Sequence, residues 1–162
     1  MGIQPVRIQP SRILPAPLAL LLLLAASSAP AQTVEGEELP ELVGLTLAES
    51  LERLGAPAEV FALRGEEAWQ DDVVFFYPQH LYLFWYQNRV WQVRLDAGYE
   101  GRFLGLGMGS RRAEVLAALG SPMKELPDSL IYQLEDRGYP VRLRLYFEEE
   151  RLVDAYCFRA DL

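Results

Sequence analysis

The chain contains a single histidine, His80, and a single cysteine, Cys157, so any reaction that needs an imidazole or a thiol must use these residues. Serine and cysteine hydrolases place such a histidine beside the nucleophile as its base. Alternation along residues 152–158 puts Cys157 on the strand face that we expect to be buried, whereas His80 lies on the other face of its own strand. We therefore predict that the two side chains do not meet and that Cys157 is a small core residue.

The acidic and glycine-rich segments lack the spacing of known metal or phosphate sites. The pairs Glu66-Glu67 and Asp71-Asp72 lack the spaced oxygen ligands and the glycine of a calcium loop. Residues 105–109 are rich in glycine but lack the Lys-Ser/Thr pair of a phosphate-binding loop. We therefore predict no catalytic residues, no metal and no cofactor. An enzyme of unknown type that uses His80 is the alternative.

A further set of residues points to binding. Strands are expected at residues 81–86, 90–95, 141–147 and 152–158, and one face of each carries aromatic side chains and arginines. These residue types are enriched at the centres of protein interfaces. The predicted protein-binding residues of this aromatic–arginine face are Tyr82, Phe84, Tyr86, Arg94, Arg142, Arg144, Tyr146 and Tyr156. The alternative is that a second layer, such as residues 39–43 or a loop, covers the face.

The opposite face of the same strands is apolar and is predicted to be the core. It carries Leu81, Leu83, Trp85, Trp91, Val93, Leu95, Leu143, Leu145, Phe147, Val153, Ala155 and Cys157. Tight turns are expected at residues 87–89 and 149–151, where each pair of strands reverses direction.

Two short helices are expected to precede these strands, within residues 44–57 and 109–122, which share one pattern at an offset of 65 residues. In the first, Thr46 and Glu49 form a capping box, and Gly55 and Pro57 end the helix. Leu47, Leu51 and Leu54 form its apolar stripe. In the second, Ser110 is the expected cap, Gly120 and Pro122 the end, and Val115, Leu116 and Leu119 the stripe.

This order of elements predicts an α+β fold built from two tandem helix–antiparallel-strand repeats, with the helices packed on one face of the sheet or sheets. The expected repeats are residues 32–100 and 101–162. The two sheets are expected to join or to lie side by side.

The first 31 residues have the pattern of a cleaved signal peptide. Arg7 and Arg12 precede an apolar run at residues 18–26, and small residues up to Ala31 favour cleavage there. The alternative, a membrane anchor, needs about 20 apolar residues. The cut has no cysteine for lipid attachment, so we predict a periplasmic or secreted protein that is not a lipoprotein and does not span the membrane after cleavage.

The charge of the chain excludes one class of partner. The 162 residues carry a net charge of −8, and loss of Arg7 and Arg12 with the leader would bring it to −10. Nucleic-acid phosphates require clustered lysine and arginine, so we predict no nucleic-acid partner.

Gly44, Thr46 and Glu49, followed by Leu54-Gly55 and Pro57, resemble the helix signature of the SmpA/OmlA (BamE) family. A tandem pair of such units resembles the β-lactamase-inhibitor-protein (BLIP) architecture, whose strands form one concave sheet that grips a partner protein. This chain lacks the lipid-site cysteine of the envelope-assembly members and the disulfides of the inhibitory members. The resemblance therefore implies a fold and a general role, and neither specific role carries over.

Together these features predict an exported, non-catalytic module of the bacterial cell envelope that binds a protein in the envelope or outside the cell through its aromatic–arginine face. The alternative is a periplasmic small-ligand-binding or sensor domain with a pocket between the repeats.

Overall fold

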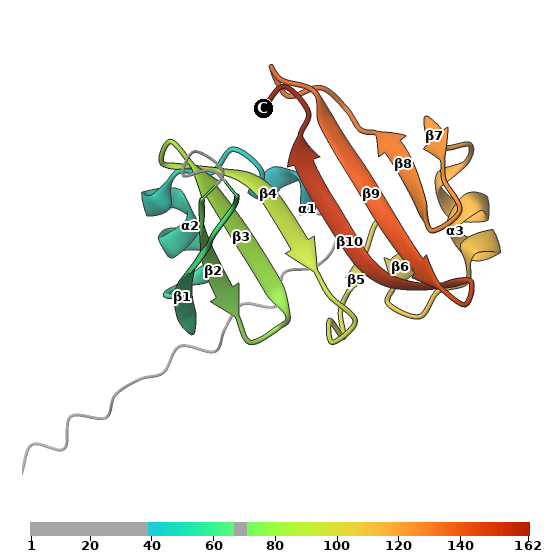
Figure 1. Ribbon diagram of the computed structural model, residues 1–162, viewed down its shortest axis with the longest axis horizontal. Coiled ribbons are helices and arrows are strands. Elements are labelled where there is room, and N and C mark those ends of the chain that lie inside the picture. The colour runs from blue at the N-terminus through green and yellow to red at the C-terminus, as the bar shows by residue number, and fades with distance from the viewer. Residues whose placement is uncertain (1–38, 67–70) are drawn as a thin grey trace, which may run out of the picture.

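The structure is a computed structural model that describes residues 39–66 and 71–162. The predicted signal peptide, with its cut after Ala31, lies outside these residues. Strands form one antiparallel sheet of eight in the order β1-β2-β3-β4-β10-β9-β8-β7 (Figure 1). Their bounds are β1 (Glu59–Leu63), β2 (Asp72–Tyr77), β3 (Leu81–Tyr86), β4 (Arg89–Leu95), β7 (Lys124–Glu125), β8 (Ser129–Gln133), β9 (Val141–Glu148) and β10 (Arg151–Arg159).

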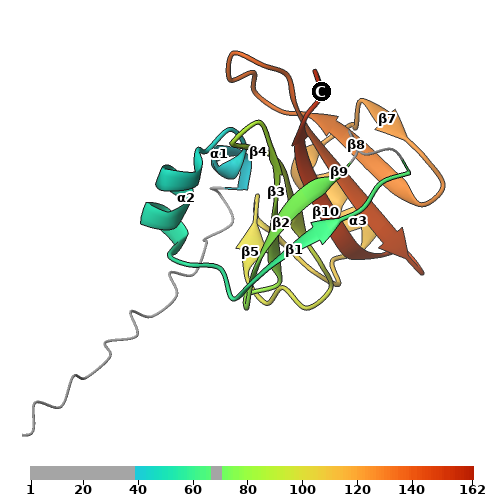
Figure 2. The same cartoon turned by 60° about the vertical axis from the view of Figure 1, so that its left-hand side comes forward.

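The hydrophobic core lies on one side of this sheet. Beneath the central strands β4 and β10 lie a short helix, α1 (Leu39–Leu42), and a small hairpin of β5 (Arg102–Phe103) and β6 (Leu106–Gly107) (Figures 1 and 2). Leu39, Leu42 and Phe103 are fully buried there against the strands. Burial of large apolar side chains of this kind is the main favourable term in folding.

The predicted fold class of two tandem repeats with helices packed on one face of the sheet is wrong. The two expected sheets do join into one, which was one of the two expected arrangements, because β4 and β10 are hydrogen-bonded neighbours at its centre. Helices α2 (Leu47–Leu54) and α3 (Arg112–Leu119) are only eight residues each. Leu47 and Leu51 of the expected core stripe are 39% and 40% exposed. The physical reason is that α1 and the β5–β6 hairpin, which the sequence reading did not assign to the core, occupy the space beneath the centre of the sheet.

The helix ends follow the sequence signals in part. Thr46 caps α2, its hydroxyl accepting from the Glu49 amide, while the Glu49 carboxylate accepts from the Thr46 amide at 2.7 Å. Both helices end at a glycine with positive φ, as predicted. The prediction that Ser110 caps α3 is wrong, because Arg111 occupies the cap position and donates its amide to Glu114 at 2.7 Å. None of the helices in the described part of the chain is long and apolar enough to cross a membrane.

Two β-bulges change which side chains enter the core. The pairing of β3 with β4 shifts at Phe84/Trp85, and the pairing of β9 with β10 shifts between Leu152 and Asp154. A bulge inserts one residue, so alternation slips by one position on that strand. Val90 and Leu152 are therefore buried, and the predictions that Trp91 and Val153 belong to the core are wrong. The other strand positions predicted as core lie on the core side, fully buried except for Trp85, which is half-buried.

Candidate protein-binding face

The face of the sheet that points away from the core carries a row of aromatic and arginine side chains. The strand register places Phe76, Tyr82, Arg94, Tyr156 and Arg144 opposite one another, on β2, β3, β4, β10 and β9 in turn. Directly opposite residues on one face of a sheet lie within contact distance. Four of the eight predicted binding residues therefore meet in a single row.

Arg94 is the centre of this row. Its guanidinium lies over the rings of Tyr82 and Tyr156, 5.3 and 5.5 Å from their centroids, a cation–π arrangement. Two of its nitrogens also donate to Asp154, at 2.9 and 2.7 Å. Such a bidentate pair fixes the orientation of the guanidinium plane and, as the first cause, raises the pKa of Arg94. The side chain is thus already neutralised by its own chain.

Tyr82 is held from the other side by Asp96. The phenol donates to the Asp96 carboxylate at 2.7 Å, and the Gly98 amide donates at 2.8 Å. Burial alone would raise the pKa of Asp96, but these two hydrogen bonds, together with the nearby His80 and Arg94, outweigh it, so the pKa lies below its ordinary value. Burial, helped by the bond to Asp96, raises the pKa of Tyr82 to about 12. The hydrogen bond to Asp96 therefore fixes the position of the phenol.

Arg144 and Tyr146 extend the row along β9. The Arg144 guanidinium lies 4.4 Å from the Tyr146 ring centroid and donates to the hydroxyl of Ser129 at 3.3 Å. The Tyr146 ring meets that of Tyr156 edge to face at 5.6 Å. Arg144 forms no ion pair within residues 39–66 and 71–162. Its charge is therefore available to a partner.

The remaining predicted residues lie outside this row. Phe84 points to the same side of the sheet but is buried, because the bulge moves Trp91 to this face, where it packs edge to face on Phe84. Tyr86 is exposed at the far end of β3. Arg142 lies in the next row, half-buried, with the Gln133 side chain 3.5 Å away. Phe84 is thus unsuited to direct contact, whereas Arg142 remains accessible.

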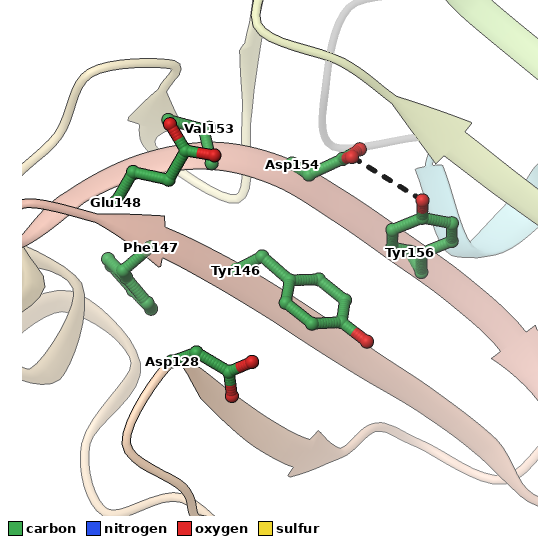
Figure 3. A pocket seen from close by; sticks show the side chains of 7 residues that line it. All are labelled: Asp128, Tyr146, Phe147, Glu148, Val153, Asp154 and Tyr156. Atoms are coloured by element: carbon green, nitrogen blue, oxygen red, sulfur yellow. Dashed lines mark hydrogen bonds between the residues drawn. The ribbon is translucent and has the colours of Figure 1, made fainter.

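A hollow of about 340 Å³ opens beside the row (Figure 3). It is lined by Asp128, Tyr146, Phe147, Glu148, Val153, Asp154 and Tyr156. Figure 3 shows the two tyrosine rings on neighbouring strands, with the Tyr156 hydroxyl bonded to Asp154. Asp128 and Glu148 are exposed, and neither belongs to an ion pair in the part of the chain that the structure describes. The hollow is therefore acidic with aromatic walls, whereas Arg142 and Arg144 make the neighbouring region basic.

The sequence suggested residues 39–43 as a possible cover for this face, but they lie elsewhere. Residues 39–43 belong to α1 and the turn after it, and Leu39, Leu42 and Val43 are buried in the core on the opposite side of the sheet. In Figure 1 the central strands have α1, β5 and β6 behind them. The half-buried state of the row comes from contacts among its own members.

His80 and Cys157 lie on opposite sides of the sheet. Cys157 is fully buried, and burial raises the pKa of its thiol to about 12, so the thiolate is disfavoured. His80 Nδ1 lies 2.8 Å from an Asp96 oxygen, in a second hollow of about 490 Å³ near the β2–β3 turn. Across residues 39–66 and 71–162, no three His, Cys, Asp or Glu side chains are grouped to hold a metal.

Sequence reasoning missed several residues of this site, among them Phe76 of the row. Trp91 and Val153 reach the face only because of the bulges, for which the sequence carries no turn or glycine signal. Asp128 and Glu148 line the hollow from the ends of two strands, where strand alternation no longer assigns a side. Asp154 shares the face of Tyr156, two residues further along the strand, but its pairing with Arg94, across 60 residues of sequence, could not be predicted from alternation.

Comparison with known proteins adds one likeness. No family model matches the chain, and no curated protein matches it. A solved structure, an extracellular protein containing a SCP domain from Bacillus anthracis str. Ames, is similar with a TM-score of 0.52 and 13% sequence identity. The match covers 82% of this chain and 47% of that one, so the chain spans about half the length of its structural neighbour. At this identity the likeness concerns the fold alone.

Proposed function

We propose that this chain is an exported, non-catalytic protein-binding module of the bacterial cell envelope, and that it binds its partner through the aromatic–arginine face. The observation that carries the proposal is Arg94, held between the rings of Tyr82 and Tyr156 and clamped by Asp154 on the side of the sheet opposite the core. This side chain and the two rings are therefore ordered by their own chain before any partner binds.

Order of this kind favours binding. A protein loses about 0.5–1.5 kcal/mol for each flexible side chain that it must immobilise in an interface. Rings and guanidinium groups that are already fixed avoid most of this cost, and tyrosine and arginine are common among the side chains that contribute most to binding. We therefore assign the central contact to Tyr82, Arg94, Tyr146 and Tyr156.

The charges around the row suggest how a partner is oriented. Arg142 and Arg144, which have no carboxylate partner within the described residues, suit acidic side chains. The hollow, which is lined by Asp128, Glu148 and two tyrosine rings, suits a lysine or arginine. A partner with both signs, spaced to match, would bind in one orientation, because the reverse orientation would bring like charges together.

The export part of the proposal is supported by the sequence. Arg7 and Arg12, the apolar run at residues 18–26 and the small residues before Ala31 favour secretion with cleavage, and the absence of a cysteine near the cut disfavours lipidation. N-terminal sequencing of the protein recovered from the periplasm or medium tests this: the proposal expects Gln32 as the first residue, and an uncleaved chain would overturn it.

The binding proposal is tested by co-purification of partners from envelope extract with the tagged chain and two variants. Arg144→Glu reverses a charge on the face, and Arg111→Glu makes the same change at the exposed cap of α3, away from the face. We expect Arg144→Glu to reduce recovery of the bound protein at least about thirtyfold, the size of a typical interface hot spot, and Arg111→Glu to leave it unchanged. Equal recovery with both variants would overturn the assignment of this face.

A further inference from the structure

The two edges of the sheet are protected very differently. β7, at one edge, has two residues, Lys124 and Glu125, both charged and exposed. β1, at the other edge, has five, and its side chains are all exposed. Val60, Phe61 and Leu63 are 58%, 41% and 51% exposed, with no proline or lysine among them. Proteins normally block a long apolar edge strand, because its free backbone groups pair readily with another strand.

The helix beneath this edge is also incompletely covered. Arg53 of α2 pairs with Glu41 of α1 at 2.9 Å, so the Arg53 flank faces the centre of the sheet. At about 100° per residue, Leu51 lies roughly 160° around the helix from Arg53. Leu47 and Leu51 therefore face away from the centre, toward the edge with β1, and Figure 1 shows α2 at that end of the sheet. One further strand beside β1 would cover this flank.

We infer that β1 pairs with β1 of a second copy of this chain, antiparallel and across a two-fold axis, to form a dimer with a sheet that runs through both copies. A two-fold axis perpendicular to the sheet keeps both α2 helices on the same side, with their Leu47 and Leu51 flanks turned toward each other. Each copy then supplies the strand and the helix cover that the other lacks, which is the self-complementarity of a two-fold interface.

The sequence of β1 selects one register. Opposite residues of an antiparallel pair share a face, so the two-fold must pass through a residue. Centred on Ala62, it pairs Phe61 with Leu63 of the second copy, twice, and leaves Glu59 opposite a glycine, Gly65. Centred on Phe61, it would press Glu59 against Leu63; centred on Leu63, it would place Val60 against Glu66. The Ala62 register also places Val60 opposite Arg64. Of the three, it is the register that pairs the large apolar side chains Phe61 and Leu63 with each other and keeps each carboxylate away from an apolar neighbour.

The charge of the edge permits this contact in an acidic protein. Arg64, beyond the end of β1, is paired with Asp71, so it adds no free charge next to the two-fold. The other charged residue, Glu59, lies at the far end of the strand from Arg64, so antiparallel pairing keeps the two Glu59 carboxylates at opposite ends of the joined strands. The surface is distinct from the aromatic–arginine face, and the inference does not depend on the proposed function.

Sedimentation velocity of the purified chain, as the cell produces it, tests the inference. We expect a concentration-dependent monomer–dimer equilibrium. Leu63→Lys, which would act twice across the two-fold, should raise the dimer dissociation constant at least about tenfold. Met123→Lys, at the opposite edge and 52% exposed, is the matched control and should leave it unchanged. A monomer at all concentrations, or a dimer equally sensitive to both substitutions, would overturn the inference.

A cross-link locates the axis without disturbing the fold. Ala62→Cys should place two sulfur-bearing residues on the two-fold, with Cα atoms about 4.5–5.5 Å apart, within the range that a disulfide spans. The native Cys157 is buried and should not compete. Mild oxidation with diamide should then give a covalent dimer from Ala62→Cys and none from the same substitution at Ala117, an exposed position on α3. No dimer from Ala62→Cys would exclude the Ala62 register.

Discussion

The pair formed by Arg94 and Asp154 should contribute measurably to stability, and a double-mutant cycle isolates its contribution. Arg94→Met keeps the stem that packs between the rings, and Asp154→Ala removes the carboxylate. The side chains of Arg94 and Asp154 are 32% and 18% exposed, so this ion pair lies between the surface class and the buried class. Exposed pairs give about 0.2–1 kcal/mol, and breaking a buried pair costs about 3–5 kcal/mol. We therefore expect a coupling free energy of about 1–2 kcal/mol.

The two single variants should also differ. Asp154→Ala leaves the Arg94 cation half-buried without a carboxylate, so it should lower the free energy of unfolding more than Arg94→Met does. Urea unfolding followed by tryptophan fluorescence measures all four proteins. The control is the Arg159–Asp161 pair, which has the same two-bond geometry near the C-terminus of the chain and should show a smaller coupling. A coupling for Arg94 and Asp154 no larger than that of the control would refute a preordered row.

Three further perturbations follow from the same contacts. Tyr82→Phe removes a hydroxyl that lowers the pKa of Asp96. The native protein should therefore be more stable than this variant at pH 7, and the difference should decline as the pH falls below about 4. Urea unfolding at several pH values measures this difference. Cys157 should react with a thiol reagent only as fast as the protein unfolds, because its thiol is buried with a pKa of about 12, and rapid labelling of the folded protein would contradict this. Phe103→Ala, beneath the sheet, should lower the free energy of unfolding by about 3–5 kcal/mol in the same assay; a loss under 1 kcal/mol would argue against a core at the β5–β6 hairpin.

Local signals predicted the parts of the fold that depend on neighbours in sequence. The Thr46–Glu49 capping box and the turn at Gln87-Asn88 involve residues a few positions apart, and both form, the turn with positive φ at each of its two residues. Strand alternation likewise assigned Tyr82, Arg94 and Tyr156 to one face. Such features depend only on the backbone geometry of a few neighbouring residues.

The parts that failed depend on contacts between distant segments. The bulges that exchange Trp91 for Val90, and Val153 for Leu152, are features of the pairing between two strands, which no short window of sequence reveals. The layer formed by α1 and the β5–β6 hairpin was not predicted because each piece is too short to show a periodicity. These omissions changed the fold class, although they left the central row of the candidate face in place.

The central claim, that the aromatic–arginine face contacts a protein partner, is tested most directly by photo-cross-linking in living cells. A photoreactive benzoylphenylalanine at Tyr146, beside the hollow, reports any protein within a few ångströms. The same group at Arg111, on the cap of α3, is the control. We predict a covalent adduct of defined mass from Tyr146 and none from Arg111. Adducts of equal yield at both positions, or none at Tyr146, would contradict the proposed function.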